Sequence, residues 1–370
     1  MKPVVLDNVW KSFGDVTAVR GLSLEGENGK TLVILGPSGA GKTTTLRLIA
    51  GLEKADKGEI YLGGKVANEL LPYERDLAMT FESYALYPHM TVFKNIASPL
   101  KAPGRRHDFS DDVIKKKVTD TAQLLGIGEL LYRMPRELSG GQRQRVALGR
   151  TLIKEPKLFL FDEPIAHLDA KLRHRMRGEM KRIFITLRSA VIYTTHDYIE
   201  ASSIGDKVAV INLGEHQQTG TPSIIFNNPV NDFVFSITCE PVPNFLKCHI
   251  VQRENKFYLE GKGVIHPVPE AFIKKIVGTT AEGIKVGVRP NDIIVSERKG
   301  DLTPLSAEVY TFEFLGSKLI VTFQVGQIKL VAEMRDVMSV EIGQKLWIGF
   351  DTSRIFAFSI STGKNILQKG

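Results

Sequence analysis

The sequence predicts two successive domains, an α/β domain with a mainly parallel sheet and then a β-rich domain. In residues 1–236, short β-branched runs alternate with longer helical stretches, a rhythm typical of helices that cover a parallel sheet. In residues 237–370, short strands are separated by turn signals. The sequence pattern changes from one type to the other across a segment with three prolines, Pro229, Pro241 and Pro243. We therefore expect the domain boundary near residue 236.

The composition excludes several classes of protein. Of the 370 residues, 43% are hydrophobic and 24% are charged, which is typical of a globular chain. No apolar run approaches the ~18 residues of a membrane-spanning helix, and Asp7 interrupts the apolar start before it could form a signal peptide. We therefore expect a chain that stays in the cytosol, with Cys239 and Cys248 as reduced, buried thiols.

The net charge of +8 raises the question of a nucleic-acid or membrane partner. The densest basic segment, residues 171–182, also carries apolar residues at three- and four-residue spacing, so its charges are typical of the wet side of an amphipathic helix. These apolar residues are Leu172, Met176, Met180, Ile183 and Leu187. The same interpretation applies to Lys115, Lys116 and Lys117, and we expect no nucleic-acid partner.

The first domain contains three segments that are typical of buried strands, residues 31–35, 158–161 and 191–195. No comparable strand is expected between about 86 and 155. Residues 111–131 instead have helical periodicity with aspartates near the start. We therefore predict a helical subdomain inserted into the α/β domain.

The second domain shows strict alternation of apolar residues. Residues 319–325 alternate, Gly326 and Gln327 form a turn, and the alternation resumes from residue 328 to 332. Residues 284–288 and 346–350 behave alike. This pattern predicts a small, partly open five-stranded barrel, or a pair of them.

A glycine-rich motif follows the first buried strand and matches GxxxxGK followed by Thr. The glycines allow successive backbone N–H groups to point at anionic oxygens, and the helix that begins near Lys42 adds its positive end. Lys42 would reach the β- and γ-phosphates, and Thr43 would offer its hydroxyl to Mg²⁺. The predicted nucleotide-binding residues are Gly36, Pro37, Ser38, Gly39, Ala40, Gly41, Lys42, Thr43 and Thr44.

Two further strands end in residues that suit phosphate chemistry. Asp162 and Glu163 follow residues 158–161 and would lie at the carboxyl edge of the sheet, where ligands of α/β proteins bind. We expect Asp162 to bind Mg²⁺ and Glu163 to polarise the attacking water. His196 follows the strand 191–195 and can donate to the γ-phosphate.

Residues 138–145, LSGGQRQR, are the decisive motif, because they resemble the signature of the ABC ATPases. With the elements above, residues 4–235 resemble an ABC nucleotide-binding domain, which has a P-loop NTPase fold. The resemblance implies ATP and Mg²⁺ as cofactors and a dimer with a second ATPase subunit. In that dimer the signature would contact the nucleotide held by the opposite subunit, through Ser139, Gly140, Gly141 and Gln142.

The resemblance also assigns roles to single residues. Lys42, Glu163 and His196 would be catalytic, Asp169 would communicate between the two sites, and Phe13 would stack on adenine.

Residues 83–90 and the β-rich domain together resemble the carbohydrate-importer branch of this family, the maltose/trehalose type. This implies an OB-like domain of TOBE or MOP type that serves regulation or dimerisation. It also implies two transmembrane permease subunits, an extracytoplasmic binding protein reached through them, and a peripheral position on the cytoplasmic face of the membrane. Residues 84–90 would line the groove for the permease; the alternative is aromatic core packing.

The sequence departs from the family at Glu82, where Gln is usual. We expect Glu82 to be a catalytic residue that ligates Mg²⁺ with Thr43 and Asp162, although it adds a negative charge near the γ-phosphate. His167 and Tyr198 are also unusual, which suggests a heteromeric transporter with a different partner ATPase as an alternative to a homodimer.

The leading hypothesis is an ATP-hydrolysing subunit that powers an importer of a sugar or related polyol, glycerol or glycerol phosphate included. One alternative is a regulatory, weakly hydrolysing partner ATPase. Another is an ABC ATPase outside transport, for which a second GxxxxGK or sustained heptads would be expected, and the sequence has neither. The cargo would contact other chains, so this sequence does not identify it.

Overall fold

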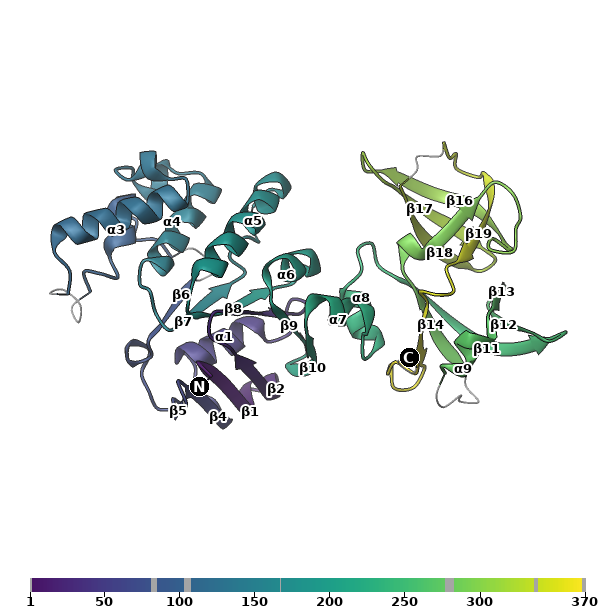
Figure 1. Ribbon diagram of the computed structural model, residues 1–370, viewed down its shortest axis with the longest axis horizontal. Coiled ribbons are helices and arrows are strands. Elements are labelled where there is room, and N and C mark those ends of the chain that lie inside the picture. Colours follow the sequence, from purple (N-terminus) through teal and green to yellow (C-terminus); the bar gives the residue numbers. More distant parts are fainter. Residues whose placement is uncertain are drawn as a thin grey trace. The chain divides into compact units, whose positions relative to one another are not determined.

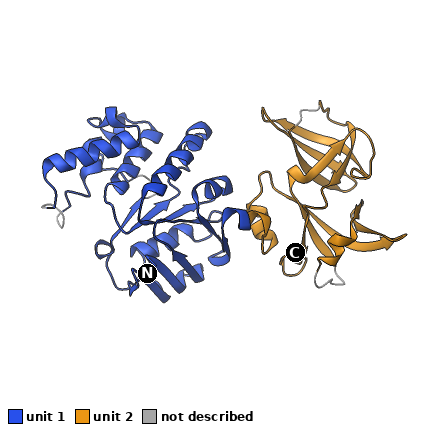
Figure 2. Ribbon diagram, viewed as in Figure 1, with its two compact units in different colours: residues 1–224 blue, residues 225–370 orange. Residues whose placement is uncertain are grey.

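The computed structural model describes residues 2–80, 85–102, 108–166, 168–276, 283–335 and 339–367. The chain divides into two compact units, residues 1–224 and 225–370 (Figure 2). Each unit is described by itself below, with the element labels of Figure 1.

A six-stranded sheet forms the centre of the first unit, in the order β10-β9-β3-β8-β7-β6. The pairs from β6 to β9 are parallel, and β10 is antiparallel to β9. The predicted parallel sheet is thus confirmed: β3 has the expected bounds, β7 extends to Asp162, and β8 starts at Ala190. The strands are β3 (Thr31–Leu35), β6 (Leu77–Thr80), β7 (Leu158–Asp162), β8 (Ala190–Thr195), β9 (Lys207–Asn212) and β10 (Glu215–Gly220).

A second, antiparallel sheet was not predicted from the sequence. Its order is β2-β1-β4-β5, and its apolar side chains share a core with β3, β8 and helix α1 (Lys42–Ala50). Register shifts interrupt the pairing of β1 with β2 and β4, so the alternation that identifies a strand is broken within β1. The strands are β1 (Val4–Phe13), β2 (Val16–Gly26), β4 (Lys57–Leu62) and β5 (Lys65–Val66).

The described part of residues 86–155 contains helices and no strand, as predicted. These are α2 (Val92–Ala97), α3 (Asp111–Leu124) and α4 (Gly140–Leu152), and Figure 1 shows α3 and α4 side by side. Helix α3 ends earlier than the predicted residue 131, because Gly126 has a positive φ of 61° and residues 128–130 form a separate 3-10 turn. Other 3-10 turns are Pro72–Glu74, Pro135–Glu137 and Pro290–Asp292.

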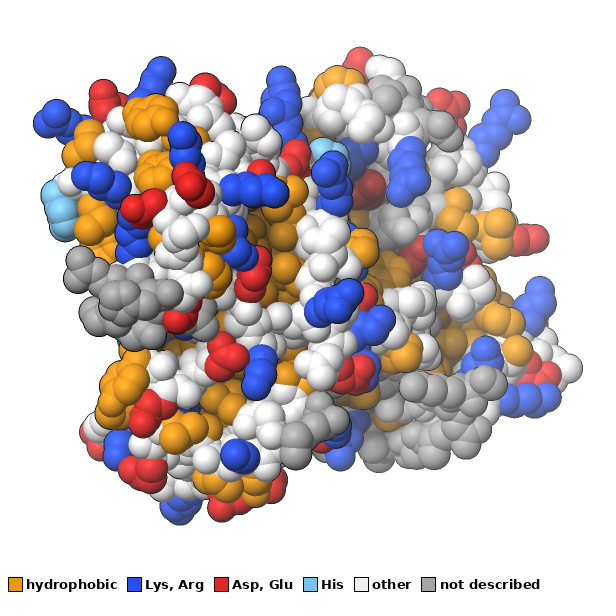
Figure 3. All heavy atoms as spheres, turned by 60° about the vertical axis from the view of Figure 1, so that its left-hand side comes forward, with side chains coloured by type: hydrophobic (Ala, Val, Ile, Leu, Met, Phe, Trp, Pro, Cys, Tyr) orange, Lys and Arg blue, Asp and Glu red, His pale blue; other side chains and the backbone are white. Residues whose placement is uncertain are grey.

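Helix α5 (Ala170–Thr186) is the predicted amphipathic helix. Met176, Met180, Ile183 and Phe184 are buried on one side. Beside this face, Arg177 lies 3.9 Å from Asp197, the N-cap of helix α6 (Tyr198–Ile204), and Lys181 lies 3.6 Å from Asp206, which follows that helix. Figure 3 likewise shows basic side chains interspersed with acidic ones on the face in view.

Two five-stranded antiparallel sheets form the second unit, in the orders β13-β12-β11-β14-β20 and β15-β19-β16-β17-β18. The predicted hairpin is confirmed, because Val325 pairs with Ile328 across the turn at Gly326 and Gln327. The strands are β11 (Asn244–Arg253), β12 (Lys256–Gly261), β13 (Val264–Val268), β14 (Ile284–Val288), β15 (Ile293–Ser296), β16 (Leu305–Phe314), β17 (Leu319–Val325), β18 (Ile328–Met334), β19 (Lys345–Phe350) and β20 (Phe356–Ser359).

The two units divide before Ile225, earlier than the expected boundary near residue 236. The cause is helix α8 (Asp232–Ile237), whose Phe235 ring lies 5.0 Å from the Phe356 ring and 5.5 Å from the Phe358 ring. Asp232 also pairs with Lys285 at 2.6 Å. The other helices of this region are α7 (Pro222–Asn227) and α9 (Glu270–Lys274).

In the described part of the chain, no helix is long and apolar enough to cross a membrane. Cys248 is buried, as expected, whereas Cys239 is only partly buried, and both thiols are free.

Candidate nucleotide-binding site

The glycine-rich loop connects the carboxyl end of β3 to the first turn of α1. Gly39 and Gly41 have positive φ values of 80° and 96°, which favour glycine. A Cβ atom on Gly41 would lie 2.3 Å from the Ala18 carbonyl oxygen, and one on Gly36 would lie 2.6 Å from the Ile211 carbonyl oxygen. The N-cap residue Gly41 has no side chain to satisfy the first N–H groups of α1, so this helix end suits an anion.

Lys42 lies across the loop that precedes it. Its side chain is only 5% exposed, and its Nζ donates to the carbonyl oxygens of Gly36 at 2.9 Å and Pro37 at 3.0 Å. Nζ is also 3.1 Å from Oε1 of Glu163. The ammonium group therefore lies at the centre of the loop, within reach of any phosphate that the loop holds.

Thr43 and Asp162 bring two oxygen ligands together. The Thr43 hydroxyl donates to Asp162 Oδ1 at 3.0 Å, and the Thr194 hydroxyl donates to the same oxygen at 2.9 Å. Hydroxyl and carboxylate oxygens are the ligands that Mg²⁺ prefers, and Mg²⁺ commonly takes one or two of them from protein and the rest from water and phosphate. This donor pair fits Mg²⁺, although the described residues hold no cluster of three or more His, Cys, Asp or Glu able to bind a metal.

Glu163 and His196 meet at the edge of the sheet. His196 Nδ1 lies 2.9 Å from Glu163 Oε2, and the Glu163 backbone N–H donates to the Thr194 hydroxyl at 3.1 Å. Glu163 has a positive φ of 41°, a conformation that costs a non-glycine residue ~1–2 kcal/mol. Strain of this kind is concentrated at functional sites, and here it points the carboxylate toward both Lys42 and His196.

A buried pair next to His196 was not predicted from the sequence. The Tyr193 hydroxyl on β8 donates to the Glu200 carboxylate on α6, and Asp197 caps that helix by accepting from the Glu200 N–H at 3.1 Å. Burial raises the pKa of Glu200 to about 7. A Glu within the first turn of a helix is common, so nothing in the sequence distinguished Glu200 from a solvated residue.

The signature residues form the N-terminus of α4. Ser139 is the N-cap, and its hydroxyl accepts from the Gln142 N–H at 3.3 Å while Gln142 Oε1 accepts from the Ser139 N–H at 2.9 Å. Ser139 and Gly140 are exposed. None of the hydrogen bonds of the described residues joins this helix end to the glycine-rich loop, so a single chain does not bring the two motifs together.

The remaining candidate residues lie elsewhere. Asp169 is the N-cap of α5 and accepts from the Leu172 N–H at 2.9 Å. Phe13 is 46% exposed at the end of β1, where a stacking ligand could reach it. Glu82 lies outside the described residues, as do Tyr84 and His167.

Tyr87 lies beside an apolar hollow in the first unit. The Asn95 side chain holds its backbone, accepting from the Tyr87 N–H at 2.8 Å and donating to the Tyr87 carbonyl oxygen at 3.1 Å. The Tyr87 ring is 44% exposed, so it does not pack into the core. It lines a cavity of about 370 Å³ together with Leu52, Pro72, Leu77, Met79, Pro99 and Arg150.

Comparison with known proteins agrees with this geometry. Residues 19–166 match the ABC transporter family model, and residues 286–358 match the TOBE domain model. The chain is 43% identical to the trehalose/maltose import ATP-binding protein MalK of Thermococcus litoralis, over 99% of this chain and 100% of the relative. This chain is an ABC transporter ATP-binding protein. It is also 39% identical to the sulfoquinovosyl glycerol transport ATP-binding protein SmoE of Agrobacterium fabrum, over 99% and 100% of the two chains.

This ABC protein also resembles a solved structure. The dimeric ABC transporter cassette MJ0796 is similar with a TM-score of 0.54 and 28% identity, over 59% of this chain and 98% of that one. The same cassette has been solved as a dimeric post-hydrolysis state bound to ADP and Pi. The fold of this family is therefore one that binds nucleotide.

Proposed function

We propose that the chain binds ATP and hydrolyses it as one half of a dimer, and that hydrolysis powers import through separate membrane subunits. The observation that carries the proposal is the convergence of Lys42, Thr43, Asp162, Glu163 and His196 through contacts of 2.9–3.1 Å. A buried ammonium, two Mg²⁺-type oxygen ligands and a carboxylate–imidazole pair are the groups that γ-phosphate hydrolysis needs.

The chain's own residues divide the work. The loop N–H groups and Lys42 hold the β- and γ-phosphates, whose oxygens compete with the Gly36 and Pro37 carbonyls for the ammonium. Glu163 orients and polarises the attacking water, and His196 donates to the γ-phosphate. Phe13 stacks on adenine. Thr43 and Asp162 would hold Mg²⁺, with Glu82 as a third oxygen ligand, and the ion would neutralise charge on the phosphates.

The second half of each site comes from the partner subunit. The N-terminus of α4, formed by Ser139, Gly140, Gly141 and Gln142, is a helix end that suits an anion, and its first two residues are exposed. In the proposed dimer it contacts the γ-phosphate in the opposite subunit, and Asp169 links the two sites. The dimeric state of the similar cassette supports this arrangement.

The hollow beside Tyr87 supports attachment to a membrane subunit. An exposed aromatic residue over an apolar cavity suits a short helix from a permease, which uses apolar anchors in such a groove. Two permease subunits would hold the ATPase dimer at the cytoplasmic face and receive cargo from an extracytoplasmic binding protein. The names of the relatives favour a sugar or a related polyol as cargo.

The test is reconstitution of the purified chain with the permease subunits encoded beside it in the genome. We expect Mg²⁺-ATP hydrolysis that the transport substrate stimulates, and loss of that hydrolysis in Lys42→Ala. The control is Lys30→Ala, which changes an exposed lysine just before β3 and should hydrolyse ATP normally. Hydrolysis that is equal in Lys42→Ala and wild type would contradict the proposal. Growth on a panel of carbon sources after gene deletion would identify the cargo.

A further inference from the structure

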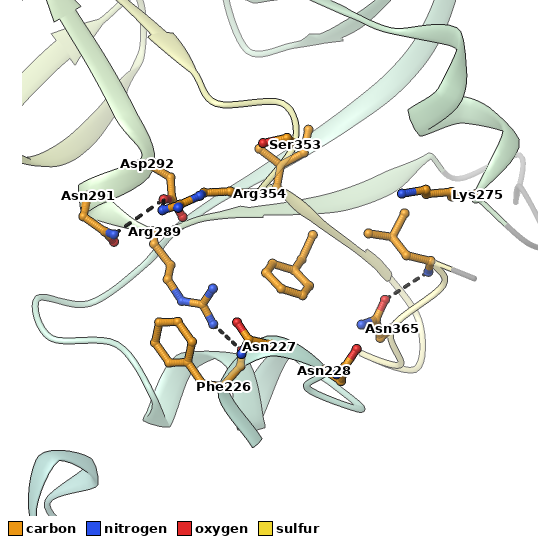
Figure 4. A pocket seen from close by; sticks show the side chains of 13 residues that line it. Phe226, Asn227, Asn228, Lys275, Arg289, Asn291, Asp292, Ser353, Arg354 and Asn365 are labelled. Atoms are coloured by element: carbon orange, nitrogen blue, oxygen red, sulfur yellow. Dashed lines mark hydrogen bonds and ion pairs between the residues drawn. The ribbon is translucent and has the colours of Figure 1, made fainter. Parts of the chain in front are cut away.

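A polar cavity of about 410 Å³ lies within the second unit (Figure 4), and none of its lining residues belongs to the nucleotide site. It is formed by the end of α7, the turn after β14, strand β20 and the segment that follows it. The charged and polar side chains that line it include Lys275, Arg289, Arg354, Asp292, Asn365 and Ser353. Its volume falls in the range of small-ligand pockets.

Arg289 is a buried cation in this cavity with an unused donor. Its side chain is 5% exposed, and its guanidinium carbon lies 3.8 Å from the centre of the Phe226 ring and 5.1 Å from that of Phe356. One Nη donates to the Phe226 carbonyl oxygen at 2.7 Å, as Figure 4 shows. Its Nε is buried and has no hydrogen-bond partner among the described residues. The buried guanidinium therefore places a fixed positive charge in the wall of the cavity, which favours an anion there.

The side chains around the cavity carry an excess of positive charge. Asp292 is the only carboxylate among the lining residues that the structure describes, and it accepts from Arg354 at 3.2 Å. Lys275 forms no ion pair with the described residues, whereas its neighbour Lys274 pairs with Glu270 at 2.8 Å. The lining thus carries three positive charges, on Lys275, Arg289 and Arg354, against the one carboxylate of Asp292, whose pKa burial raises and both arginines lower. Guanidinium and ammonium groups both bind phosphate well.

The rest of the lining suits hydroxyl groups. The Asn365 amide donates to the Pro229 carbonyl oxygen at 2.8 Å, and its oxygen accepts from the Leu367 N–H at 2.9 Å. That oxygen keeps a second lone pair, and the amide nitrogen keeps a second N–H. The Ser353 hydroxyl donates to Asp351 and can still accept. Amides and hydroxyls beside aromatic rings are typical of sites for sugars and polyols.

We propose that this cavity is a binding site for a small phosphorylated sugar or polyol, with Lys275 on the phosphate and the amide and hydroxyl side chains on the polyol. Arg289, on the opposite side of the cavity, adds a fixed positive charge to the site. The site is separate from the nucleotide site and does not depend on hydrolysis. It gives the second unit a ligand of its own.

The test is calorimetric titration of the full chain with glucose 6-phosphate and glycerol 3-phosphate, and with glucose as the uncharged match. Lys275→Glu reverses one charge on an exposed side chain at the cavity and leaves the core intact. Lys274→Glu is the matched control, because it makes the same change one residue away on a side chain that does not line the cavity. Lys42→Ala removes phosphate binding by the glycine-rich loop.

We expect saturable binding of at least one of the two phosphorylated probes and none of glucose. Lys275→Glu should raise the dissociation constant by about tenfold or more, while Lys274→Glu and Lys42→Ala should leave it within about twofold. The proposal is overturned if neither probe binds, if Lys275→Glu binds as wild type does, or if binding disappears in Lys42→Ala.

Discussion

The glycine-rich loop and the signature helix are both anion-binding helix ends, yet the chain treats them differently. Around the loop, Lys42 contacts Glu163, Glu163 contacts His196 and Thr43 contacts Asp162, at the start of α1 and the ends of β7 and β8. Around the signature, Ser139 and Gln142 only cap their own helix and face solvent. The difference fits the proposed dimer, in which one chain builds half of each catalytic site and its partner supplies the other half.

The first prediction concerns the assembled half. Glu163→Gln removes the carboxylate that would accept the proton of the attacking water, while the amide preserves the shape of the side chain. We expect turnover to fall by ~10²–10⁴-fold, the usual contribution of a general base, with ATP affinity unchanged. Steady-state hydrolysis and equilibrium binding of ATP measure the two quantities.

The control for this variant is Glu155→Gln, which changes a mostly exposed carboxylate that pairs with Lys117 on the surface. It should hydrolyse ATP at the wild-type rate. If Glu163→Gln retained wild-type turnover, the assembled half would not contain the general base that its geometry suggests.

The second prediction concerns the half that awaits a partner. Ser139→Asp keeps a good N-cap for α4 but places a negative charge where the partner's γ-phosphate would bind. We expect hydrolysis to fall by ~10²–10³-fold, comparable to the loss of one transition-state donor, with thermal stability and ATP binding to the loop unchanged. Ser139→Ala should instead lower the free energy of unfolding by ~1 kcal/mol. A Ser139→Asp protein that hydrolyses ATP normally would mean that the signature does not approach phosphate.

The third prediction concerns the pH dependence of stability that buried Glu200 causes. Burial raises the pKa of Glu200 from its ordinary value of 4.5 to about 7. Between these values the unfolded chain loses the proton that the folded chain keeps, so the free energy of unfolding falls as pH rises from about 4.5 to about 7. We expect the first unit to lose on the order of 2–3 kcal/mol over this interval.

Glu200→Gln should flatten this profile and make the protein more stable than wild type at pH 8. The amide oxygen can accept the hydrogen bond from the Tyr193 hydroxyl, and the amide does not ionise. Thermal unfolding at several pH values measures it. Equal slopes in wild type and variant would show that Glu200 titrates normally in the folded chain.

The smallest effect is expected at Thr43. Thr43→Val keeps the shape of the side chain but removes one of the two oxygen ligands that fit Mg²⁺. The Mg²⁺ concentration at half-maximal hydrolysis should rise by about tenfold, with ATP binding in the absence of Mg²⁺ unchanged. An unchanged Mg²⁺ requirement would exclude Thr43 as a ligand.

Much of the assembled half could be predicted from the sequence, because its residues follow buried strands directly. β3, β7 and β8 are short apolar runs, and parallel strands bring their carboxyl ends to one edge. The antiparallel sheet of β1, β2, β4 and β5 was missed, because register shifts break its alternation. The Tyr193–Glu200 pair was missed because only packing makes an ordinary helix glutamate a buried one.

The boundary and the second cavity show another limit. The prolines predicted a domain boundary near residue 236, but ring contacts of Phe235 attach α8 to the second unit. The cavity gathers residues from α7, β20 and the segments that follow α9 and β14, which lie far apart in the sequence. No local motif could predict which of their side chains would meet.

The most direct test of the split site uses mixed dimers in a Glu163→Gln background, where ATP is held rather than consumed. A chain with Lys42→Ala and a differently tagged chain with Ser139→Asp are produced together, and the mixed dimer is purified through both tags. Its one intact site joins Lys42 of one chain to Ser139 of the other. ATP that is held by the loop of one chain alone should dissociate during rapid gel filtration, so we predict that ATP remains bound to the mixed dimer and to neither parent. A mixed dimer that retains no more ATP than its parents would contradict the account.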